Sequence, residues 1–291
     1  MKYKDANWAR VRCLFETPIL DERKWAKIPG IPADAFIIDL EDSVPLAAKE
    51  QAREIAVGYV RDPSFFDGRL TIPRPNHLDT AWGKDDVIAF AEAGAQFMML
   101  PKVDTADNVH AMLELARSHG ADPKILASIE SSRGVLECDR IFQMPEVVAS
   151  TFGPGDLHVD ARYPMREPDG SMNRALLYAK SRVGLAGTAY GVAVLGIAYQ
   201  RNLKDEDEVR VTVADEKLFG FTGLSAFYPP HVPIINAAFT PSDAEIAAAT
   251  ELISAYEAAV ADGNPAVQLP DGSAVLVHQY KAAQDVLARA R

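Results

Sequence analysis

Short apolar segments alternate with helical patterns along most of the chain before Pro229. Most of these segments are continuously apolar, which is typical of strands that are buried on both faces. Their first residues are spaced by roughly 22 to 45 positions, enough for a strand, a helix and two loops each time. The eight segments are residues 11–15, 35–40, 69–72, 96–100, 125–129, 147–152, 192–197 and 224–227. This repeat predicts an α/β fold, a closed parallel (β/α)₈ TIM barrel.

An open, doubly wound sheet is the alternative arrangement of alternating strands and helices. Such a sheet more often carries a glycine-rich phosphate-binding loop after its first strand. The segment after the first apolar run here is Glu16-Thr17-Pro18, which is not such a loop. The sequence therefore favours the closed barrel.

Helix signals separate several of the strand segments. Ser43 is expected to be an N-cap, with Pro45 in the first turn of a helix that continues over residues 47–60. Thr105 is expected to cap a helix that stops at Gly120. Further helical patterns cover residues 173–189, 205–219 and 240–261.

The C-terminal end departs from the barrel repeat. A hairpin is predicted around Pro270-Asp271-Gly272, and a helix over residues 279–290 follows it. No linker rich in proline, glycine or serine divides the chain. We expect a barrel over residues 1–240 and a helix–hairpin–helix extension over residues 241–291, which packs on the barrel or on a neighbouring subunit.

Composition and charge exclude several classes of function. The net charge of −11 leaves no basic surplus for a nucleic acid, although a few local cations could still attract an anionic substrate. Cys13 and Cys138 lie in no metal-binding or disulfide pattern, so we expect two buried bystanders. Residues 1–10 lack the apolar core of a signal peptide, and residues 184–198 are too few to span a bilayer. We expect a cytoplasmic protein with no membrane partner.

Charged residues gather where the predicted strands end. The carboxyl ends of the strands carry the active site in (β/α)₈ barrels. The candidates are Asp39, Glu41 and Asp42 after the second strand, Arg74 after the third, Lys102 after the fourth, Glu130 after the fifth and Asp156 after the sixth. Carboxylates at this density repel one another, so a metal ion or the two cations must balance them.

A divalent metal ion fits two of these carboxylates. Magnesium takes one or two protein carboxylates and fills its coordination with water and substrate oxygens. Glu130 and Asp156, on adjacent strands, are the expected ligands of Mg²⁺ or Mn²⁺. Glu41 or Asp42 would hold a metal-bound water, and Arg74 would bind a substrate carboxylate or stabilise an enolate.

Each of the other candidates has a structural alternative. Asp42 could instead be a helix cap, because it precedes Ser43. Lys102 is a candidate substrate-binding residue, but like Arg74 it could form only a structural ion pair. Pro154 and Gly155 are candidates for the substrate pocket unless the Gly-Pro-Gly segment forms only a tight turn.

Several motifs resemble the citrate lyase β-subunit-like, or HpcH–HpaI aldolase, family. Asp39-Leu-Glu-Asp-Ser-Val-Pro45 is similar to the family's DLEDAVP segment. Four further blocks follow in the family's order: Leu100-Pro-Lys-Val103, Ile129-Glu-Ser131 with Gly134, Phe152-Gly-x-x-Asp-Leu157, and Asn236-Ala-Ala-Phe-Thr-Pro-Ser242. The resemblance covers nearly the whole chain, from Arg12 into the terminal helix.

The resemblance implies a (β/α)₈ barrel that forms a homo-oligomer, a trimer or hexamer. It implies Mg²⁺ on Glu130 and Asp156 and contacts between Arg74 and substrate oxygens. The reaction it implies is aldol- or Claisen-type cleavage or condensation of a small hydroxy or keto acid, or of its CoA thioester. The metal ion stabilises the enolate in that chemistry.

Three departures from the family pattern affect the groups that bind substrate and supply protons. The family's PGNRP arginine is replaced by Leu20 or Asp21, depending on the alignment. The histidine of its IHPxQ block is replaced by Tyr228, which becomes a candidate substrate-binding residue. The acidic residue of its MxD block, which acts in a neighbouring subunit, is replaced by Leu276. His278 could serve as the acid from a shifted position, or that role could be lost.

Three hypotheses follow. The first is a Mg²⁺-dependent carbon–carbon lyase acting on a small carboxylic acid or acyl-CoA, with the proton handled by His278 or Tyr228. The second is an acyl-CoA thioester hydrolase on the same scaffold. The third is a non-catalytic relative that binds a metabolite.

Overall fold

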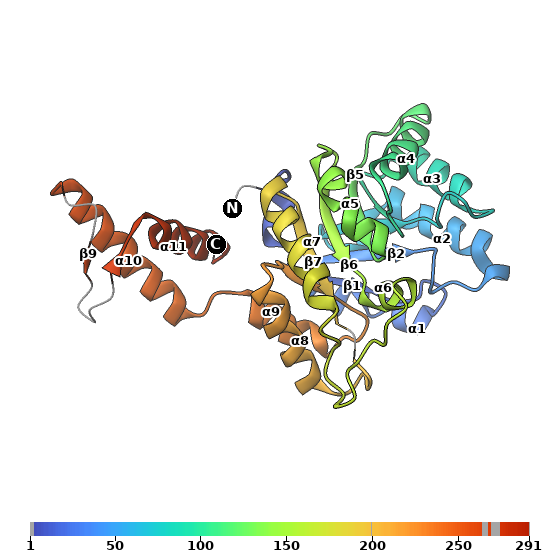
Figure 1. The fold of residues 1–291 in the computed structure, drawn as a ribbon. Helices are drawn as coiled ribbons and strands as arrows, with labels where there is room; N and C mark the ends of the chain where they lie inside the picture. The colour runs from blue at the N-terminus through green and yellow to red at the C-terminus, as the bar shows by residue number, and fades with distance from the viewer. Residues whose placement is uncertain (1–2, 199, 264–266, 269–273, 291) are drawn as a thin grey trace. The chain divides into compact units, whose positions relative to one another are not determined.

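The computed structural model describes residues 3–198, 200–263, 267–268 and 274–290. The chain divides into two compact units (Figure 1). The barrel unit ends at Asn236, and the C-terminal unit begins at Ala237. Helix α9 (His231–Phe239) contains this division.

Eight parallel strands form the sheet of the barrel unit. They are β1 (Cys13–Glu16), β2 (Ala35–Asp39), β3 (Leu70–Arg74), β4 (Phe97–Leu100), β5 (Lys124–Ile129), β6 (Val147–Phe152), β7 (Ala193–Ile197) and β8 (Gly223–Ala226). Hydrogen-bonded neighbours follow the order β3-β2-β1-β8-β7-β6-β5-β4. Since β3 and β4, at the two ends of this order, also lie side by side, the sheet curves into a nearly closed barrel. The predicted (β/α)₈ fold is confirmed.

Helices surround this sheet in the barrel unit (Figure 1). They are α1 (Glu22–Trp25), α2 (Lys49–Arg61), α3 (Gly83–Glu92), α4 (Ala106–Ser118), α5 (Ser132–Gln143), α6 (Pro154–Asp160), α7 (Leu176–Tyr190) and α8 (Glu206–Leu218). In the described part of the chain, no helix is long and apolar enough to cross a membrane.

The eight strand segments predicted from apolar runs all form strands, with ends that differ by at most two residues. The predicted cap at Thr105 is also confirmed, because its side chain and that of Asn108 form a capping box at the start of α4. Both cysteines are buried and unpaired, as expected. The continuous apolar runs therefore predicted the positions of the strands correctly. The conformation of the turns between strands and helices was predicted less well.

The prediction that Ser43 caps the second helix is wrong. Helix α2 begins only at Lys49, after a 3₁₀ turn over Leu46–Ala48. Pro45 has an extended backbone with ψ of 147°, which is incompatible with a helical first turn there. The N–H of Ser43 instead donates to Asp39 Oδ2 over 2.9 Å. The segment between β2 and α2 is thus a turn organised by Asp39.

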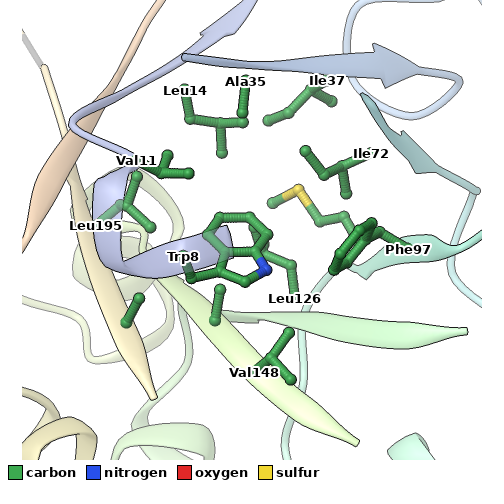
Figure 2. Close-up of a cluster of buried hydrophobic side chains, with 13 residues drawn as sticks. Trp8, Val11, Leu14, Ala35, Ile37, Ile72, Phe97, Leu126, Val148 and Leu195 are labelled. Atoms are coloured by element: carbon green, nitrogen blue, oxygen red, sulfur yellow. The ribbon is translucent and has the colours of Figure 1, made fainter. Parts of the chain in front are cut away.

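Trp8 closes the amino-terminal end of the barrel. It lies in a short 3₁₀ helix, η1 (Ala6–Arg10), and its side chain is fully buried. Figure 2 shows its indole among inward-facing residues of several strands, including Leu14, Ile72 and Leu126. It meets the ring of Phe97 edge to face, with centroids 6.0 Å apart. A segment outside the sheet therefore contributes one large side chain to the barrel core.

Replacing Trp8 with alanine is expected to lower the free energy of unfolding by about 3–5 kcal/mol, because it leaves a large cavity among packed side chains. Urea unfolding of the full chain measures this loss. Leu218→Ala is the matched control, since Leu218 is 83% exposed and its loss should change stability little. Equal unfolding midpoints for the two variants would show that Trp8 is not part of the barrel core.

The C-terminal unit contains two helices and a short hairpin. Helix α10 (Asp243–Ala261) starts with a capping box between Ser242 and Glu245, two residues later than predicted. Strands β9 (Val267–Gln268) and β10 (Ala274–Val275) pair antiparallel, and α11 (Val277–Arg289) follows. The predicted turn at 270–272 lies outside the described residues. That this extension packs on the barrel or on a neighbouring subunit stays a prediction.

Candidate active site at the carboxyl ends of the strands

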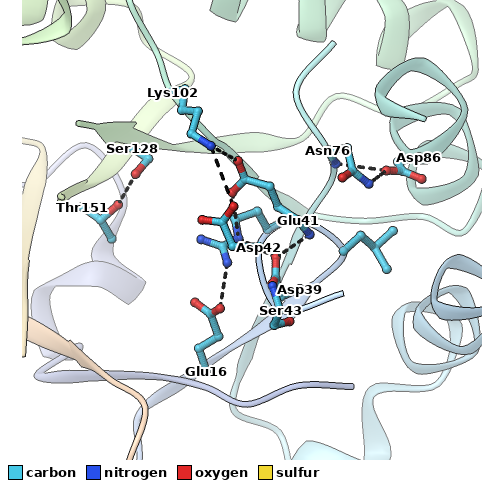
Figure 3. Close-up of polar contacts among 12 residues, drawn as sticks. Glu16, Asp39, Glu41, Asp42, Ser43, Asn76, Asp86, Lys102, Ser128 and Thr151 are labelled. Atoms are coloured by element: carbon cyan, nitrogen blue, oxygen red, sulfur yellow. Dashed lines mark hydrogen bonds and ion pairs between the residues drawn. The ribbon is translucent and has the colours of Figure 1, made fainter. Parts of the chain in front are cut away.

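Most of the charged residues predicted for the barrel rim are linked by hydrogen bonds and ion pairs, and Figure 3 shows Asp39, Glu41, Asp42 and Lys102 among them. Asp39 ends β2 and Arg74 ends β3, and the two are paired in register across the sheet. Lys102, Glu130 and Asp156 follow β4, β5 and β6 in the chain. The parallel sheet thus delivers all of these side chains to the same end of the barrel.

Asp39 shapes the turn that presents Glu41 and Asp42. Its carboxylate is fully buried, and its two oxygens accept the N–H groups of Glu41 (2.8 Å) and Ser43 (2.9 Å). Burial opposes ionisation, but the charge and hydrogen bond of Arg74 outweigh it, so the pKa of Asp39 lies below its usual value. The ionised form of Asp39 is therefore favoured, and its two oxygens support the turn.

Arg74 is held by carboxylates on three sides. Its Nε donates to Asp39 Oδ1 (2.6 Å) and lies 3.6 Å from Glu41 Oε2, and its Nη2 donates to Glu16 Oε1 (2.7 Å). No hydrogen bond within the described residues uses Nη1. The guanidinium is thus locked in one orientation by structural ion pairs and retains one nitrogen for a ligand.

Glu16 was not among the residues predicted for the site. It is the last residue of β1 and only 6% exposed, and its Oε1 accepts a hydrogen bond from Nη2 of Arg74. Burial, reinforced by Asp39, Asp42 and Glu41, raises the pKa of Glu16 to about 8 despite the charge of Arg74. A proton therefore resides on this carboxyl group at neutral pH. Its position directly after the first apolar run was the available signal.

The variant Glu16→Gln is expected to flatten the dependence of stability on pH. The pKa of Glu16 is about 8 in the folded chain and about 4.5 in the unfolded one, so the folded state binds more protons between these values. Its contribution to stability is present at acidic pH and is lost as the pH rises toward 8. Glutamine keeps the neutral shape and the acceptor for Arg74 at every pH. Urea unfolding from about pH 5 to pH 8 tests this, and parallel curves for variant and wild type would contradict it.

Lys102 links the turn after β2 to Glu130. Its Nζ donates to Glu41 Oε1 (2.9 Å) and lies 3.8 Å from Asp42 Oδ1, while its backbone N–H donates to Glu130 Oε1 (2.8 Å). Its φ of +50° lies in the left-handed region, which is costly for a lysine. Such strain persists where surrounding contacts enforce it, often at functional sites. The alternative that Asp42 caps a helix is excluded, since α2 starts seven residues later.

Glu130 and Asp156 suit a divalent cation. Burial above all, with the negative charges of Glu41 and Asp156, raises the pKa of Glu130 to about 7. A Cβ on Gly153 would lie 2.7 Å from Glu130 Oε2, so the missing side chain leaves room for this carboxylate. Asp156, in the first turn of α6, is exposed. Within the described residues, neither carboxylate is within 4.0 Å of a cationic side chain, and a metal ion held by the two would balance their charge.

A metal ion here would depend on water and substrate for most of its ligands. Among the described residues, no three His, Cys, Asp or Glu side chains are grouped to hold a metal ion by themselves. Two carboxylates plus water and substrate oxygens is the arrangement that magnesium favours. The donor set therefore fits Mg²⁺ and would leave coordination positions open to a substrate.

The model of the HpcH/HpaI aldolase/citrate lyase family matches residues 20–229, most of the chain. The chain belongs to this family. A (3S)-malyl-CoA thioesterase of Cereibacter sphaeroides is 33% identical over 279 residues, which cover 96% of this chain and 94% of the relative. The citrate lyase subunit beta of Escherichia coli is 31% identical over 267 residues, covering 89% and 86%.

A solved structure of a relative has a similar fold. The protein CitE of Mycobacterium tuberculosis, in complex with magnesium, acetoacetate and coenzyme A, aligns with a TM-score of 0.79 and 26% identity. The alignment covers 98% of this chain and 99% of that protein. The family resemblance expected from the motifs is confirmed, and this relative binds the classes of ligand that the resemblance implied.

The other residues predicted for the site differ in how far they are buried. Pro154 is buried in the first turn of α6, with Gly155 next to it. Tyr228 is half-buried after β8 and meets the ring of His231 edge to face. His278 is exposed on α11 in the C-terminal unit, so its part in the chemistry stays a prediction.

The family departures also have structural consequences. Asp21, one of the two residues aligned with the family's arginine, caps α1 by accepting the N–H of Lys24 over 3.1 Å. It therefore has a structural task and no positive charge. Leu276 is the N-cap residue of α11 and is 42% exposed. Neither residue supplies the charged group that the family pattern has there.

Proposed function

We propose that the chain is a Mg²⁺-dependent carbon–carbon lyase that acts on the CoA thioester of a small hydroxy acid. The observation that carries this proposal is the pair Glu130 and Asp156, set beside an arginine locked in place with one nitrogen free. A cation held by Glu130 and Asp156 would supply a Lewis acid that stabilises negative charge on the oxygens of the released keto acid.

The residues of the chain itself provide binding and proton transfer. Nη1 of Arg74 is available for a substrate carboxylate, and the clamp of Glu16 and Asp39 fixes its direction. Burial raises the pKa of Glu41, so this carboxylate is suited to take the proton of the substrate hydroxyl. Loss of that proton starts the cleavage. Tyr228, at the end of β8, is the candidate in the barrel unit for returning a proton to the enolate.

Thioester hydrolysis on the same scaffold is the second candidate. It is favoured by the similarity to a (3S)-malyl-CoA thioesterase over 96% of the chain. A water held by Glu41 or Asp42 would be the nucleophile. The departures at Tyr228 and Leu276 also point this way, because hydrolysis releases no carbanion that an acid must protonate.

One experiment separates these reactions. The full chain is incubated with Mg²⁺ and (3S)-malyl-CoA, and the products are followed by mass spectrometry. Cleavage of the carbon–carbon bond gives glyoxylate and acetyl-CoA in equal amounts, whereas hydrolysis consumes water and gives malate and free CoA. Glu130→Gln is the inactive control for both. Saturable binding without either product would identify a non-catalytic relative and overturn the proposed activity.

A further inference from the structure

Lys49 is buried directly beneath the acidic turn and has no assigned role. It is the first residue of α2 and is only 4% exposed. Its Nζ donates to the carbonyl oxygens of Leu40 (2.7 Å) and Glu41 (2.6 Å). The same ammonium group lies 6.0 Å from the ring centroid of Trp82. All three contacts are made by a side chain that the sequence pattern assigns to a helix surface.

The formation of α2 does not explain this placement. The amino terminus of a helix carries partial positive charge, so a lysine there is unfavourable for the helix. Burial costs free energy in addition, and it lowers the pKa of Lys49 in spite of Asp39 and Glu41 nearby. A methionine or leucine would fill the same space without these costs. The hydrogen bonds of Lys49 to the two carbonyl groups offset these costs. Both carbonyl groups belong to the turn and not to the helix.

The contacts of Lys49 complete the restraint of this turn. Asp39 binds the N–H groups of Glu41 and Ser43, and Lys49 binds the carbonyl groups of Leu40 and Glu41. Both polar groups of the Glu41 backbone are therefore held by buried charged side chains. The direction in which the Glu41 carboxylate leaves the turn is fixed as a result.

That direction matters for the rest of the site. The Glu41 carboxylate meets Lys102 Nζ at 2.9 Å and Arg74 Nε at 3.6 Å. The backbone N–H of Lys102 in turn holds Glu130 at 2.8 Å. A shift of the turn would thus change the contact of Glu41 with Arg74. Through Lys102, it would also change the position of Glu130, the candidate metal ligand. Misplacement by about 1 Å can cost on the order of 100-fold in rate.

We propose that Lys49 is a positioning residue of this site: its ammonium group anchors the backbone of the turn at residues 40 and 41, and so sets where Glu41 meets Lys102 and Arg74. The inference rests on the proposed Mg²⁺-dependent function for its effect on turnover. Its effect on the turn itself is independent of that function.

The test compares Lys49→Met with Lys180→Met in the full chain. Lys180 is equally buried, at 3%, and its Nζ pairs with Asp215 and Glu216 between α7 and α8. Each variant removes one buried ammonium group. Lys49→Met thereby removes the hydrogen bonds to two carbonyl groups, and Lys180→Met removes the ion pairs with two carboxylates. Five quantities are measured: the thermal midpoint, the affinity for Mg²⁺ by calorimetry, kcat and KM with (3S)-malyl-CoA, and amide hydrogen exchange of a peptide covering residues 39–43.

Lys49→Met is expected to lower kcat and Mg²⁺ affinity by about 10- to 100-fold with little change in KM, and to speed exchange in the turn. Lys180→Met is expected to lose thermal stability while it keeps kcat, Mg²⁺ affinity and slow exchange. Equal losses of activity in the two variants, or unchanged exchange in Lys49→Met, would overturn the inference. If the wild type neither binds Mg²⁺ nor turns over, the proposed function has failed, and the exchange comparison alone decides the role of Lys49.

Discussion

Replacing Arg74 with methionine is expected to destabilise the protein by about 3–5 kcal/mol and to abolish turnover. The guanidinium is the counterion of the Asp39 carboxylate, which is 0% exposed, and it also donates to the buried, protonated carboxyl group of Glu16. Methionine would leave the charge of Asp39 buried without a cation, and Glu41 would lose one of its two positive neighbours. Removing one member of a buried ion pair costs far more than the pair contributes, since the remaining charge keeps its desolvation penalty.

The double variant Arg74→Met/Asp39→Asn separates the loss of charge balance from the loss of chemistry. Asparagine removes the uncompensated buried charge, so urea unfolding should show partial recovery of stability. Turnover should not recover, because the arginine proposed to bind the substrate carboxylate is absent. Arg117→Met is the matched control. Its partners Asp122 and Glu146 lie at an exposed position, where solvent screens the pair and little change is expected.

Two results would contradict this account of Arg74. Wild-type stability in Arg74→Met would show that the arginine does not balance the buried charge of Asp39. Retained kcat with the arginine absent would show that it neither binds substrate nor stabilises charge in the reaction. Either result would direct attention to Lys102 as the cation of the site.

The sequence predicted the strands well because each is a continuous apolar run, and a buried parallel strand tolerates little else. It also placed Asp39, Arg74 and Glu130 at the carboxyl ends of strands, and parallel strands deliver these ends to one side of the barrel. Glu16 was missed because it closes an apolar run and resembles an ordinary loop residue. Its partner Arg74 lies 58 residues away in the chain, and no local pattern records that contact.

Two further features of the site depend on distances that a sequence pattern does not contain. Lys49 resembles a solvated lysine in a charged helix, and only the folded turn shows its bonds to the carbonyl groups. Ser43 with Pro45 resembles a helix start, yet Asp39 captures the N–H of Ser43 and the chain turns instead. In both cases a buried charged group outside the local segment overrides the local preference.

Removing either candidate metal ligand is expected to weaken Mg²⁺ binding by on the order of 100-fold. Glu130→Gln and Asp156→Asn each halve the negative charge that the protein offers the cation while they preserve the shape of the side chain. No third carboxylate, histidine or cysteine in the described part of the chain is grouped with them to replace the lost ligand. Isothermal titration of metal-free protein with Mg²⁺ measures the effect directly.

The same titration with pyruvate present tests whether the cation and a keto acid share the site. In the wild type, pyruvate should tighten Mg²⁺ binding, because its oxygens fill coordination positions that two carboxylates leave open. Both variants should lose this coupling. Asp160→Asn is the matched control on the same helix as Asp156. Asp160 accepts the N–H of Ser132 over 2.7 Å at an exposed position, so its loss should leave the coupling intact.

The outcome decides between a metal centre and a self-contained ion-pair network. Coupling in the wild type and in Asp160→Asn, with none in the other two variants, would assign the cation to Glu130 and Asp156. Since a bound ligand stabilises only the folded state, Mg²⁺ should then raise the unfolding midpoint of the wild type more than that of either ligand variant. If the wild type binds neither Mg²⁺ nor pyruvate, the negative charge of the rim must be balanced without a metal ion. Protons on Glu16 and Glu130 and the positive charges of Arg74 and Lys102 would then provide that balance. The barrel would have kept its acidic cluster without the metal chemistry.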